Sequence, residues 1–419
     1  MNAVFFNEYI QTSPRFMTDF TPWTLFVDTG IISVLLLLGK LMRVKIRFIQ
    51  RLFIPPSLLA GFIGLSLGPH GFGIIPLSTQ TGTYAGILIA FIFGALPLIS
   101  QKAAKGDADN IGSMWAYSQA GMLLQWAFGG LLGLLVLNRI WPLNPAFGIT
   151  MPSGYCGGIV AAVIIGLIII KWGTKKGHTS FLANYDDLPH ELQTGLLPGD
   201  KRESMGESSC SSISIDPLTF NLIIVAVIAL GGYCISKTVS HFMPGFELPV
   251  FSCAFVVGIF IKKIFDKTRT SDYVCPQTIG HISGAFTDFL VAFGIASIKI
   301  SVVIEYIIPL LILLVSGLIA TLIYVLVMAR KLMKECWFEK AIFTWGWFTG
   351  TMAMGIALLR VADPKMRSRC LDNYALAYLF IAPVEISLIT FAPVAFLNGY
   401  GLVFTGICLA AGLAVLATA

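Results

Sequence analysis

Two short segments of the sequence combine glycine with hydroxyl side chains inside otherwise apolar stretches. The first holds Ser153, Gly154, Gly157 and Gly158, and the second holds Thr349, Gly350 and Thr351. Exposed backbone N–H groups at the starts of half-helices, together with hydroxyls, are what an anionic ligand needs. We therefore take these residues as candidate substrate-binding residues. Plain close packing of helices through glycine is the alternative for each segment taken alone.

Arg360 follows the second of these segments and is a further candidate for substrate binding. A guanidinium binds a carboxylate through two parallel hydrogen bonds, so it suits an anionic substrate. Arg360 also belongs to a basic stretch, and such a residue can simply anchor the chain at a membrane surface. The sequence leaves both interpretations open.

Asp288 lies in an apolar segment at 280–298, where a carboxylate costs about 2.5 to 3.5 kcal/mol unless it is paired or hydrated. A stripe at i, i+4 spacing comprises Gly284, Asp288, Ala292 and Ala296. We expect this stripe to face another helix rather than lipid. Asp288 is then either a packed, locally bonded carboxyl or, with Thr287, a sodium ligand, because hard cations take carboxylate, carbonyl and hydroxyl oxygens.

Glu385 lies about 20 Å into a span that starts near Asp372. An unpaired glutamate at this depth is unusual, so we also take it as a candidate ion-binding residue. Asp28 and Glu305 lie nearer the outer interface, where hydration is cheap. We expect these two to have structural roles.

The composition is that of a polytopic membrane protein. Of 419 residues, 56% are hydrophobic and 12% charged, and the mean hydropathy is +0.82. Each crossing needs about 20 apolar residues, so little chain remains for a catalytic domain outside the membrane. The five histidines form no metal-binding pattern and there is no P-loop, which argues against an enzyme, a cofactor or a primary pump. The net charge of +6 reflects membrane orientation rather than a nucleic-acid partner.

Twelve apolar segments alternate with short loops. They lie near 22–39, 53–68, 83–100, 114–138, 146–170, 219–236, 247–261, 280–298, 306–329, 341–359, 373–397 and 400–418. When alternate loops are assigned to one side, nearly all Lys and Arg fall there. The exceptions are Arg15, Arg139, Lys237 and Lys299. The basic side is cytoplasmic, so the N-terminus is expected outside and the central loop inside.

The segment at 341–359 fits this scheme only if it enters from the cytoplasm and returns there, because basic residues flank it on both sides. We expect a re-entrant hairpin. Gly346 and Gly355, with the residues between them, predict an irregular polar backbone, which membrane depth tolerates only where protein or a water-filled cavity surrounds it.

The two halves of the chain share spaced motifs. The matches are Pro55, Ala60 and Gly64 with Pro249, Ala254 and Gly258, then Leu88, Ala90 and Phe91 with Leu290, Ala292 and Phe293, and Ser153-Gly154 with Thr349-Gly350. The first half starts outside and the second inside, so the repeats are inverted. Inverted repeats with interrupted segments are typical of secondary transporters. Chance matching of low-complexity membrane sequence is the alternative.

Phe246-Glu247-Leu248-Pro249, Ile54-Pro55-Pro56, the glycine-rich hairpins and the basic central loop resemble the sodium/glutamate symporter family. The resemblance runs from about residue 22 to 398. It implies an all-α protein with two inverted repeats of about five transmembrane helices, each with a re-entrant hairpin. It also implies a homodimer and elevator-like, sodium-coupled uptake of glutamate or a similar small anion.

The expected organisation follows from this resemblance and the segment boundaries. It comprises an extracytoplasmic segment at 1–21, a first repeat at 22–171, a cytoplasmic linker at 172–217, a second repeat at 218–398 and an additional transmembrane helix at 399–419. The expected location is the inner (plasma) membrane, with Na⁺ as coupling ion.

The first repeat departs from the family pattern. The stretch from Ala146 to Lys171 is less than half as long as its counterpart from Ala341 to Asn398. Wholly helical, it reaches about 39 Å, enough for one crossing and no hairpin. We therefore expect a single discontinuous helix, broken near Pro152 to Gly158. The alternative function is a transport-impaired or regulatory membrane protein that retains the symporter scaffold.

Overall fold

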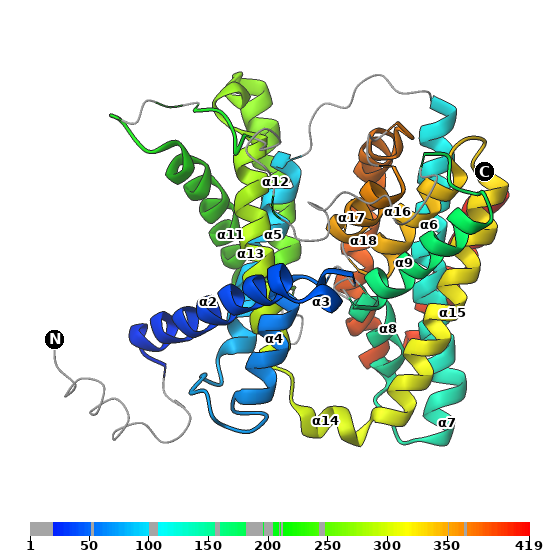
Figure 1. Ribbon diagram of the computed structural model, residues 1–419, viewed down its shortest axis with the longest axis horizontal. Coiled ribbons are helices and arrows are strands. Elements are labelled where there is room, and N and C mark those ends of the chain that lie inside the picture. The colour runs from blue at the N-terminus through cyan, green and yellow to red at the C-terminus, as the bar shows by residue number, and fades with distance from the viewer. Residues whose placement is uncertain are drawn as a thin grey trace. The chain divides into compact units, whose positions relative to one another are not determined.

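The protein is helical throughout the part of the chain that its computed structural model describes (Figure 1). That part comprises residues 20–51, 54–99, 108–155, 160–181, 196, 204–208, 210, 213–242, 248–350, 352–363 and 367–419. Seven of its helices are long and apolar enough to cross a membrane. The protein is therefore an all-α, multi-pass membrane protein.

The chain forms two compact units, each built from both halves of the sequence. Unit 1 comprises residues 1–50, 54–101 and 195–304, and unit 2 comprises residues 51–53, 102–194 and 305–419. The compact units therefore do not coincide with the two sequence repeats, because each takes helices from both.

Unit 1 contains six main helices. They are α2 (Pro22–Lys45), α4 (Pro56–Leu67), α5 (Thr81–Ile99), α11 (Pro217–Phe242), α12 (Val250–Thr268) and α13 (Pro276–Ala296). The shorter elements α3 (Arg47–Arg51) and η5 (Ser271–Tyr273) lie between them, and α14 (Ile300–Glu305) follows α13 at the boundary with unit 2. Helix α4 packs against α2 and α13, whereas α12 packs against α11 and α5, and α5 contacts α13. The packing is thus reciprocal: α4, the second of the first three helices, contacts α13, the last of the second three, and α12 contacts α5 in the same way.

The matched prolines and glycines of unit 1 have matched surroundings. Pro55 and Pro249 are the N-cap residues of α4 and α12, with similar ψ angles of 144° and 133°. A Cβ on Gly64 would lie 3.1 Å from the Cβ of Ala296 on α13, and one on Gly258 would lie 2.6 Å from the carbonyl oxygen of Gly94 on α5. Both glycines therefore permit a close approach to the partner helix.

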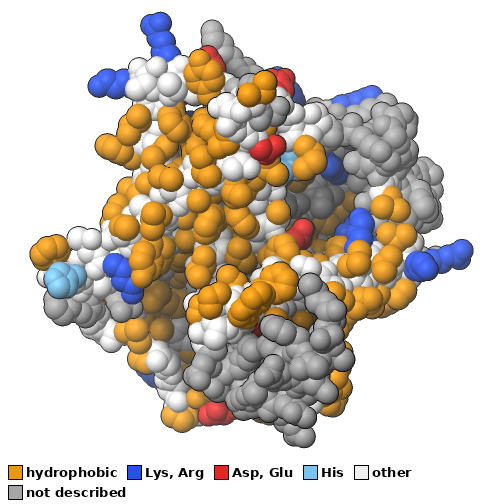
Figure 2. Space-filling view, turned by 90° about the vertical axis from the view of Figure 1, so that its left-hand side faces the viewer, with side chains coloured by type: hydrophobic (Ala, Val, Ile, Leu, Met, Phe, Trp, Pro, Cys, Tyr) orange, Lys and Arg blue, Asp and Glu red, His pale blue; other side chains and the backbone are white. Residues whose placement is uncertain are grey.

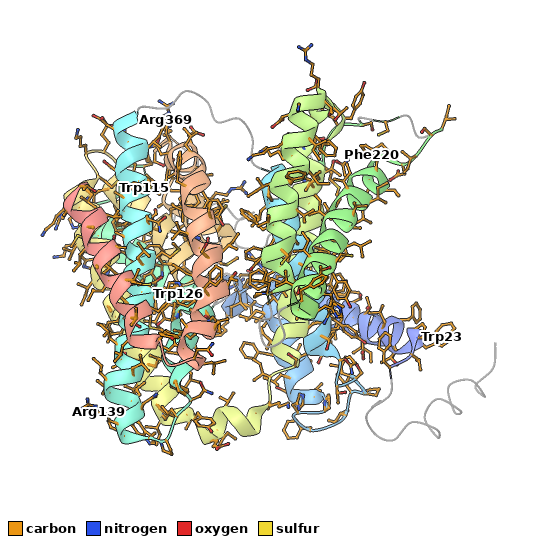
Figure 3. The ribbon with its side chains drawn as sticks, turned by 180° about the vertical axis from the view of Figure 1, so that it is seen from behind. Trp23, Trp115, Trp126, Arg139, Phe220 and Arg369 are labelled. Carbon is orange, nitrogen blue, oxygen red and sulfur yellow. The ribbon has the colours of Figure 1, made fainter. Side chains whose placement is uncertain are left out.

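Unit 2 is arranged around one long helical run. This run is α6 (Ala108–Leu131), the π-helical stretch η1 (Leu132–Leu137) and α7 (Asn138–Ile140). The remaining elements are η2 (Pro145–Ile149), α8 (Thr150–Tyr155), α9 (Val160–Lys175), α15 (Ile307–Leu332), α16 (Trp337–Phe348), α17 (Met352–Ala362), α18 (Cys370–Leu397) and α19 (Gly401–Ala417). Helix α6 packs against α15, α18 and α19. Figure 3 shows Trp126 near the middle of this run and Arg139 and Arg369 at opposite ends of the unit.

Large apolar side chains remain exposed along the membrane-length helices. Examples are Val34, Leu37 and Leu41 of α2, Val227 and Leu230 of α11, Phe260 of α12 and Ile319 and Ile323 of α15. Figure 2 shows hydrophobic side chains spread over much of one face, with few charged ones between them. Exposed apolar surface of this extent is the surface of a protein surrounded by lipid.

Asp28 differs from its expected environment. The side chain is buried, not hydrated. Its carboxylate accepts hydrogen bonds from the Ser78 N–H at 2.9 Å, the Ser78 hydroxyl and the Tyr84 hydroxyl at 3.0 Å. The expectation of hydration was wrong, because the residues that lead into α5 supply the donors that water would have supplied. Glu305, in contrast, is exposed as expected.

Candidate functional site

The segment expected to be a hairpin forms two short helices that pack against each other, α16 and α17. A Cβ on Gly346 would lie 2.6 Å from the Cα of Gly355, so the two backbones approach as closely as glycine allows. Both glycines are helical, so the expected irregular backbone is wrong beyond the turn itself. Close helix packing explains the glycines instead.

The turn of the hairpin is buried. Thr349 follows the last residue of α16 and is 1% exposed. Its hydroxyl donates to the carbonyl oxygen of Trp345 at 2.7 Å. Gly350 is buried beside it, and Thr351 lies outside the described residues. Helix α17 begins at Met352, so its first N–H groups lie at this turn. Free N–H groups at a helix start attract anions.

Gln125 of α6 holds the turn in place, a role that the sequence did not reveal. Its amide donates to the carbonyl oxygen of Phe348 at 3.2 Å and to the hydroxyl oxygen of Thr321 on α15 at 2.9 Å. The only signal in the sequence was an amide inside an apolar segment. A cavity of about 270 Å³ lies beside these residues. It is lined mainly by apolar residues, and Gly121 and Tyr324 also line it.

The base of the hairpin carries buried charged residues. Glu339 is fully buried and accepts hydrogen bonds from the Ser180 N–H and, at 3.2 Å, from the Ser180 hydroxyl. Burial raises the pKa of Glu339. Lys340 is also buried and donates to the side-chain oxygen of Asn110 at 3.5 Å. The start of the central linker therefore contacts the hairpin base.

Aromatic contacts extend this attachment of the linker. The ring of His178 lies 5.2 Å from that of Trp172 on α9 and 5.4 Å from that of Trp337 on α16. Arg330 also lies over the Trp337 ring, with its guanidinium carbon 5.0 Å from the ring centre. Residues 182–194, in the middle of the expected linker, lie outside the described part of the chain.

The first segment has a different structure. A short 3₁₀ helix, η2, leads into α8, which ends at Tyr155, and a separate helix, α9, begins at Val160. Residues 156–159 between them lie outside the described part of the chain, so the expected break near Pro152 to Gly158 stays a prediction. Ser153 and Gly154 are exposed on α8, whereas Gly157 and Gly158 lie outside the described residues. Thr349 and Gly350 at the turn between α16 and α17 are buried. The matched pairs Ser153 with Thr349 and Gly154 with Gly350 therefore do not share an environment.

Glu385 is connected to the hairpin through aromatic rings. Its carboxylate accepts a hydrogen bond from the Tyr378 hydroxyl at 3.1 Å. The Tyr378 ring stacks on Tyr374 at 5.4 Å, and Trp347 of α16 lies 5.2 Å from the Tyr374 ring and 6.4 Å from that of Tyr378. Arg360 lies exposed near the far end of α17. Tyr378 was another partner that the sequence did not reveal.

Asp288 and Thr287 belong to unit 1, whereas the hairpin and Glu385 belong to unit 2. Asp288 is exposed and interacts electrostatically with Lys40 of α2. The Thr287 hydroxyl donates to the Ser283 carbonyl within α13 at 2.8 Å. No cluster of three or more His, Cys, Asp or Glu side chains occurs among the residues with described positions. The structure therefore does not gather such ligands at Asp288.

The stripe that includes Asp288 is only half packed. Ala292 and Ala296 are buried in a cluster with Ile32 and Leu35 of α2. No atom lies within 4 Å of a Cβ placed on Gly284, and Asp288 is exposed. The expectation that the whole stripe faces another helix was wrong for its first half, because the packed cluster covers only the end of α13.

The family model described as sodium/glutamate symporter matches residues 132–357. This match covers more than half of the chain and includes both glycine-containing segments. The chain belongs to the sodium/glutamate symporter family. A search among curated proteins finds no match. Membership indicates a sodium-coupled transporter rather than an enzyme, and it does not favour the alternative of a transport-impaired protein.

Proposed function

We propose that the protein is a symporter that couples the import of glutamate or a similar small anion to Na⁺. The observation that carries this proposal is the buried hairpin of α16 and α17, whose turn is held by a hydrogen bond from Gln125. The chain also belongs to a family of sodium-coupled transporters. Interrupted helices at such a position are where secondary transporters bind substrate. The substrate site is the turn at Thr349 and Gly350, and Thr351 is a candidate from the sequence that lies outside the described residues.

The chemistry of the turn suits a carboxylate. The first N–H groups of α17 and the positive end of its dipole attract negative charge, and the Thr349 hydroxyl adds polarity. Ser153 and Gly154 of α8, which are exposed, are the proposed contribution of the opposite repeat. Arg360 lies about 12 Å from the start of α17 along the helix axis, which favours a role in anchoring the chain over contact with the same substrate.

Candidate oxygen ligands for Na⁺ lie in unit 1. Asp288 and Thr287 of unit 1 offer oxygens of the right type, but Asp288 is exposed and the Thr287 hydroxyl donates within its own helix. We assign Glu385 of unit 2, the third ion-binding candidate from the sequence, to the substrate rather than to Na⁺, because its partner Tyr378 lies among aromatic rings next to the hairpin.

The division into two units supports an elevator-like mechanism with inverted repeats. Unit 2 contains the proposed substrate site, and the reciprocal packing of α4 with α13 and of α12 with α5 in unit 1 is what a two-fold related pair of repeats would produce. Unit 1 would then be the static scaffold and the contact surface of a homodimer. The expected setting is the inner (plasma) membrane, with the N-terminus outside and α19 as an addition to the repeats.

Uptake of labelled glutamate into proteoliposomes tests the proposal. An inward sodium gradient should drive accumulation, whereas an equal potassium gradient should not. The matched pair for this assay is Gly346→Ala, whose new methyl group would meet backbone atoms, and Gly406→Ala of α19, which has open space around it and should keep uptake. Uptake that is independent of sodium, or absent with a folded protein, would refute the proposed function.

A further inference from the structure

Glu385 occupies a position in unit 2 that no other acidic residue of its described part shares. The others are Asp109, Glu305, Glu335, Glu339, Asp363 and Asp372, and each lies within about one turn of a helix end. Glu385 lies near the middle of α18, about 20 Å from its start. A carboxylate at that depth costs about 2.5 to 3.5 kcal/mol unless something offsets it.

The protein itself provides only part of that offset. The Tyr378 hydroxyl donates one hydrogen bond to the carboxylate. Among the described residues, the ion pairs between side chains are Lys334 with Asp109 and Arg369 with Asp372, so Glu385 has no cationic partner there. Glu385 and Tyr378 are both partly accessible within unit 2. A ligand that carries positive charge would complete the site.

The aromatic rings around Tyr378, whose hydroxyl meets the carboxylate, favour an organic cation. Tyr378 and Tyr374 stack on each other, and Trp347 contacts both. An ammonium group is attracted both by a carboxylate and by aromatic faces. Trp347 immediately precedes Phe348 and the hairpin turn, so a chain of contacts through Trp347 and Tyr378 leads from the turn to Glu385.

We propose that Glu385, oriented by Tyr378, binds the ammonium group of the substrate and so selects amino dicarboxylates over dicarboxylates that lack an amino group. This inference rests on the proposed symport function. The donors at the turn recognise carboxylates and cannot distinguish glutamate from glutarate. A fixed carboxylate does so twice, because it attracts the ammonium of glutamate and repels the second net negative charge of glutarate.

Competition between unlabelled glutamate and glutarate for uptake of labelled glutamate tests this inference at saturating sodium. The wild type should prefer glutamate strongly. Glu385→Gln should weaken inhibition by glutamate by at least about tenfold and leave inhibition by glutarate unchanged or stronger, which collapses the preference. Tyr378→Phe should act in the same direction by a smaller factor. Glu305→Gln, an exposed acid in α14, should change neither value.

The sodium dependence distinguishes this role from that of an ion ligand. The sodium concentration for half-maximal uptake should stay the same in Glu385→Gln. If that concentration rises and the preference for glutamate is kept, Glu385 binds sodium and the inference is refuted. An equal loss for both competitors would refute it as well.

Two further measurements keep the test decisive. If Glu385→Gln does not transport, stabilisation of the purified variant against heat by glutamate and by glutarate replaces the uptake ratio, and Glu385→Asp should retain the preference. If the wild type shows no sodium-dependent uptake, the proposed function itself fails and the inference fails with it. Wild-type uptake with an unchanged ratio in the variant refutes the inference alone.

Discussion

The hairpin of α16 and α17 and the segment of η2, α8 and α9 contain the same types of residue, yet they use glycine differently. In the hairpin, Gly346 and Gly355 pack the two helices of one segment against each other. In the other segment, Gly148 packs against Gly129 and Gly133 of the α6 run. Glycine pairing therefore closes one segment on itself and fixes the other to a neighbouring helix.

Chain length explains this difference. The second segment has enough residues for two helices, a turn and a following crossing, so its turn becomes buried among α6, α15 and α18. The first has residues for one crossing only, and its Ser153 and Gly154 stay exposed. Matched motifs therefore do not guarantee matched burial, because burial depends on how much chain surrounds them.

The largest expected effect comes from filling the glycine contact within the hairpin. In Gly346→Ala, the new methyl group would meet backbone atoms of Gly355 and Met354, which cannot move aside as a side chain can. We expect a loss of about 1 to 3 kcal/mol in stability and loss of uptake. Thermal unfolding in detergent and the proteoliposome assay measure both. For the stability measurement the control is Gly154→Ala, which has open space around it, and an equal loss of stability in the two variants would contradict the contrast between the segments.

A smaller effect is expected from the side chains that attach each segment to its neighbours. Gln125→Leu leaves the Phe348 carbonyl and the Thr321 hydroxyl without this donor, and we expect a loss of about 1 to 2 kcal/mol, about 1 kcal/mol for each hydrogen bond. Tyr155→Phe removes a single hydrogen bond from the Tyr155 hydroxyl to the Leu314 carbonyl of α15 and should cost about 1 kcal/mol. Thermal unfolding should rank the variants in this order. The reverse order would mean that the first segment is the more firmly held of the two.

The smallest effect concerns pH at the base of the hairpin. Because burial raises the pKa of Glu339 above its unfolded value, the protonated form is favoured in the folded protein. The resulting stability is present below the unfolded pKa, near 4.3, and is lost as pH rises through the raised folded pKa. Glu339→Gln should flatten this fall, measured by thermal unfolding between about pH 4 and pH 8. Glu335→Gln, exposed nearby, should keep it, and identical pH profiles for wild type and Glu339→Gln would refute the prediction.

The sequence predicted most helices because hydrophobic segment length reports directly on membrane crossing. The span near 306–329 became α15 (Ile307–Leu332), and the expected hairpin at 341–359 became α16 and α17 within a few residues of its expected ends. The partners of polar side chains were not predictable. Gln119 and Gln125 both interrupt the same apolar segment, and only the folded structure shows that Gln125 reaches Phe348, 223 residues away in the chain.

Burial was the other quantity that the sequence did not reveal. Asp28 lies where hydration was expected, but three donated hydrogen bonds from the segment 78–84 replace water. The composition of the two compact units was equally hidden, because contacts between α4 and α13 or α12 and α5 join residues of different halves. Apolar helices can pair in many ways, and small residues such as Gly64 and Gly258 select among them only in three dimensions.

The central claim is that the first segment crosses the membrane once, whereas the second enters and leaves on the same side. Cysteine labelling with a membrane-impermeant reagent tests it most directly, in a variant that lacks the eight native cysteines. Four exposed positions serve: Thr150→Cys and Lys171→Cys flank the first segment, and Glu335→Cys and Arg367→Cys flank the second. We predict that Thr150→Cys labels only from outside and that the other three label only from the cytoplasmic side. Labelling of Thr150→Cys and Lys171→Cys from the same side, or of Glu335→Cys and Arg367→Cys from opposite sides, would contradict the account.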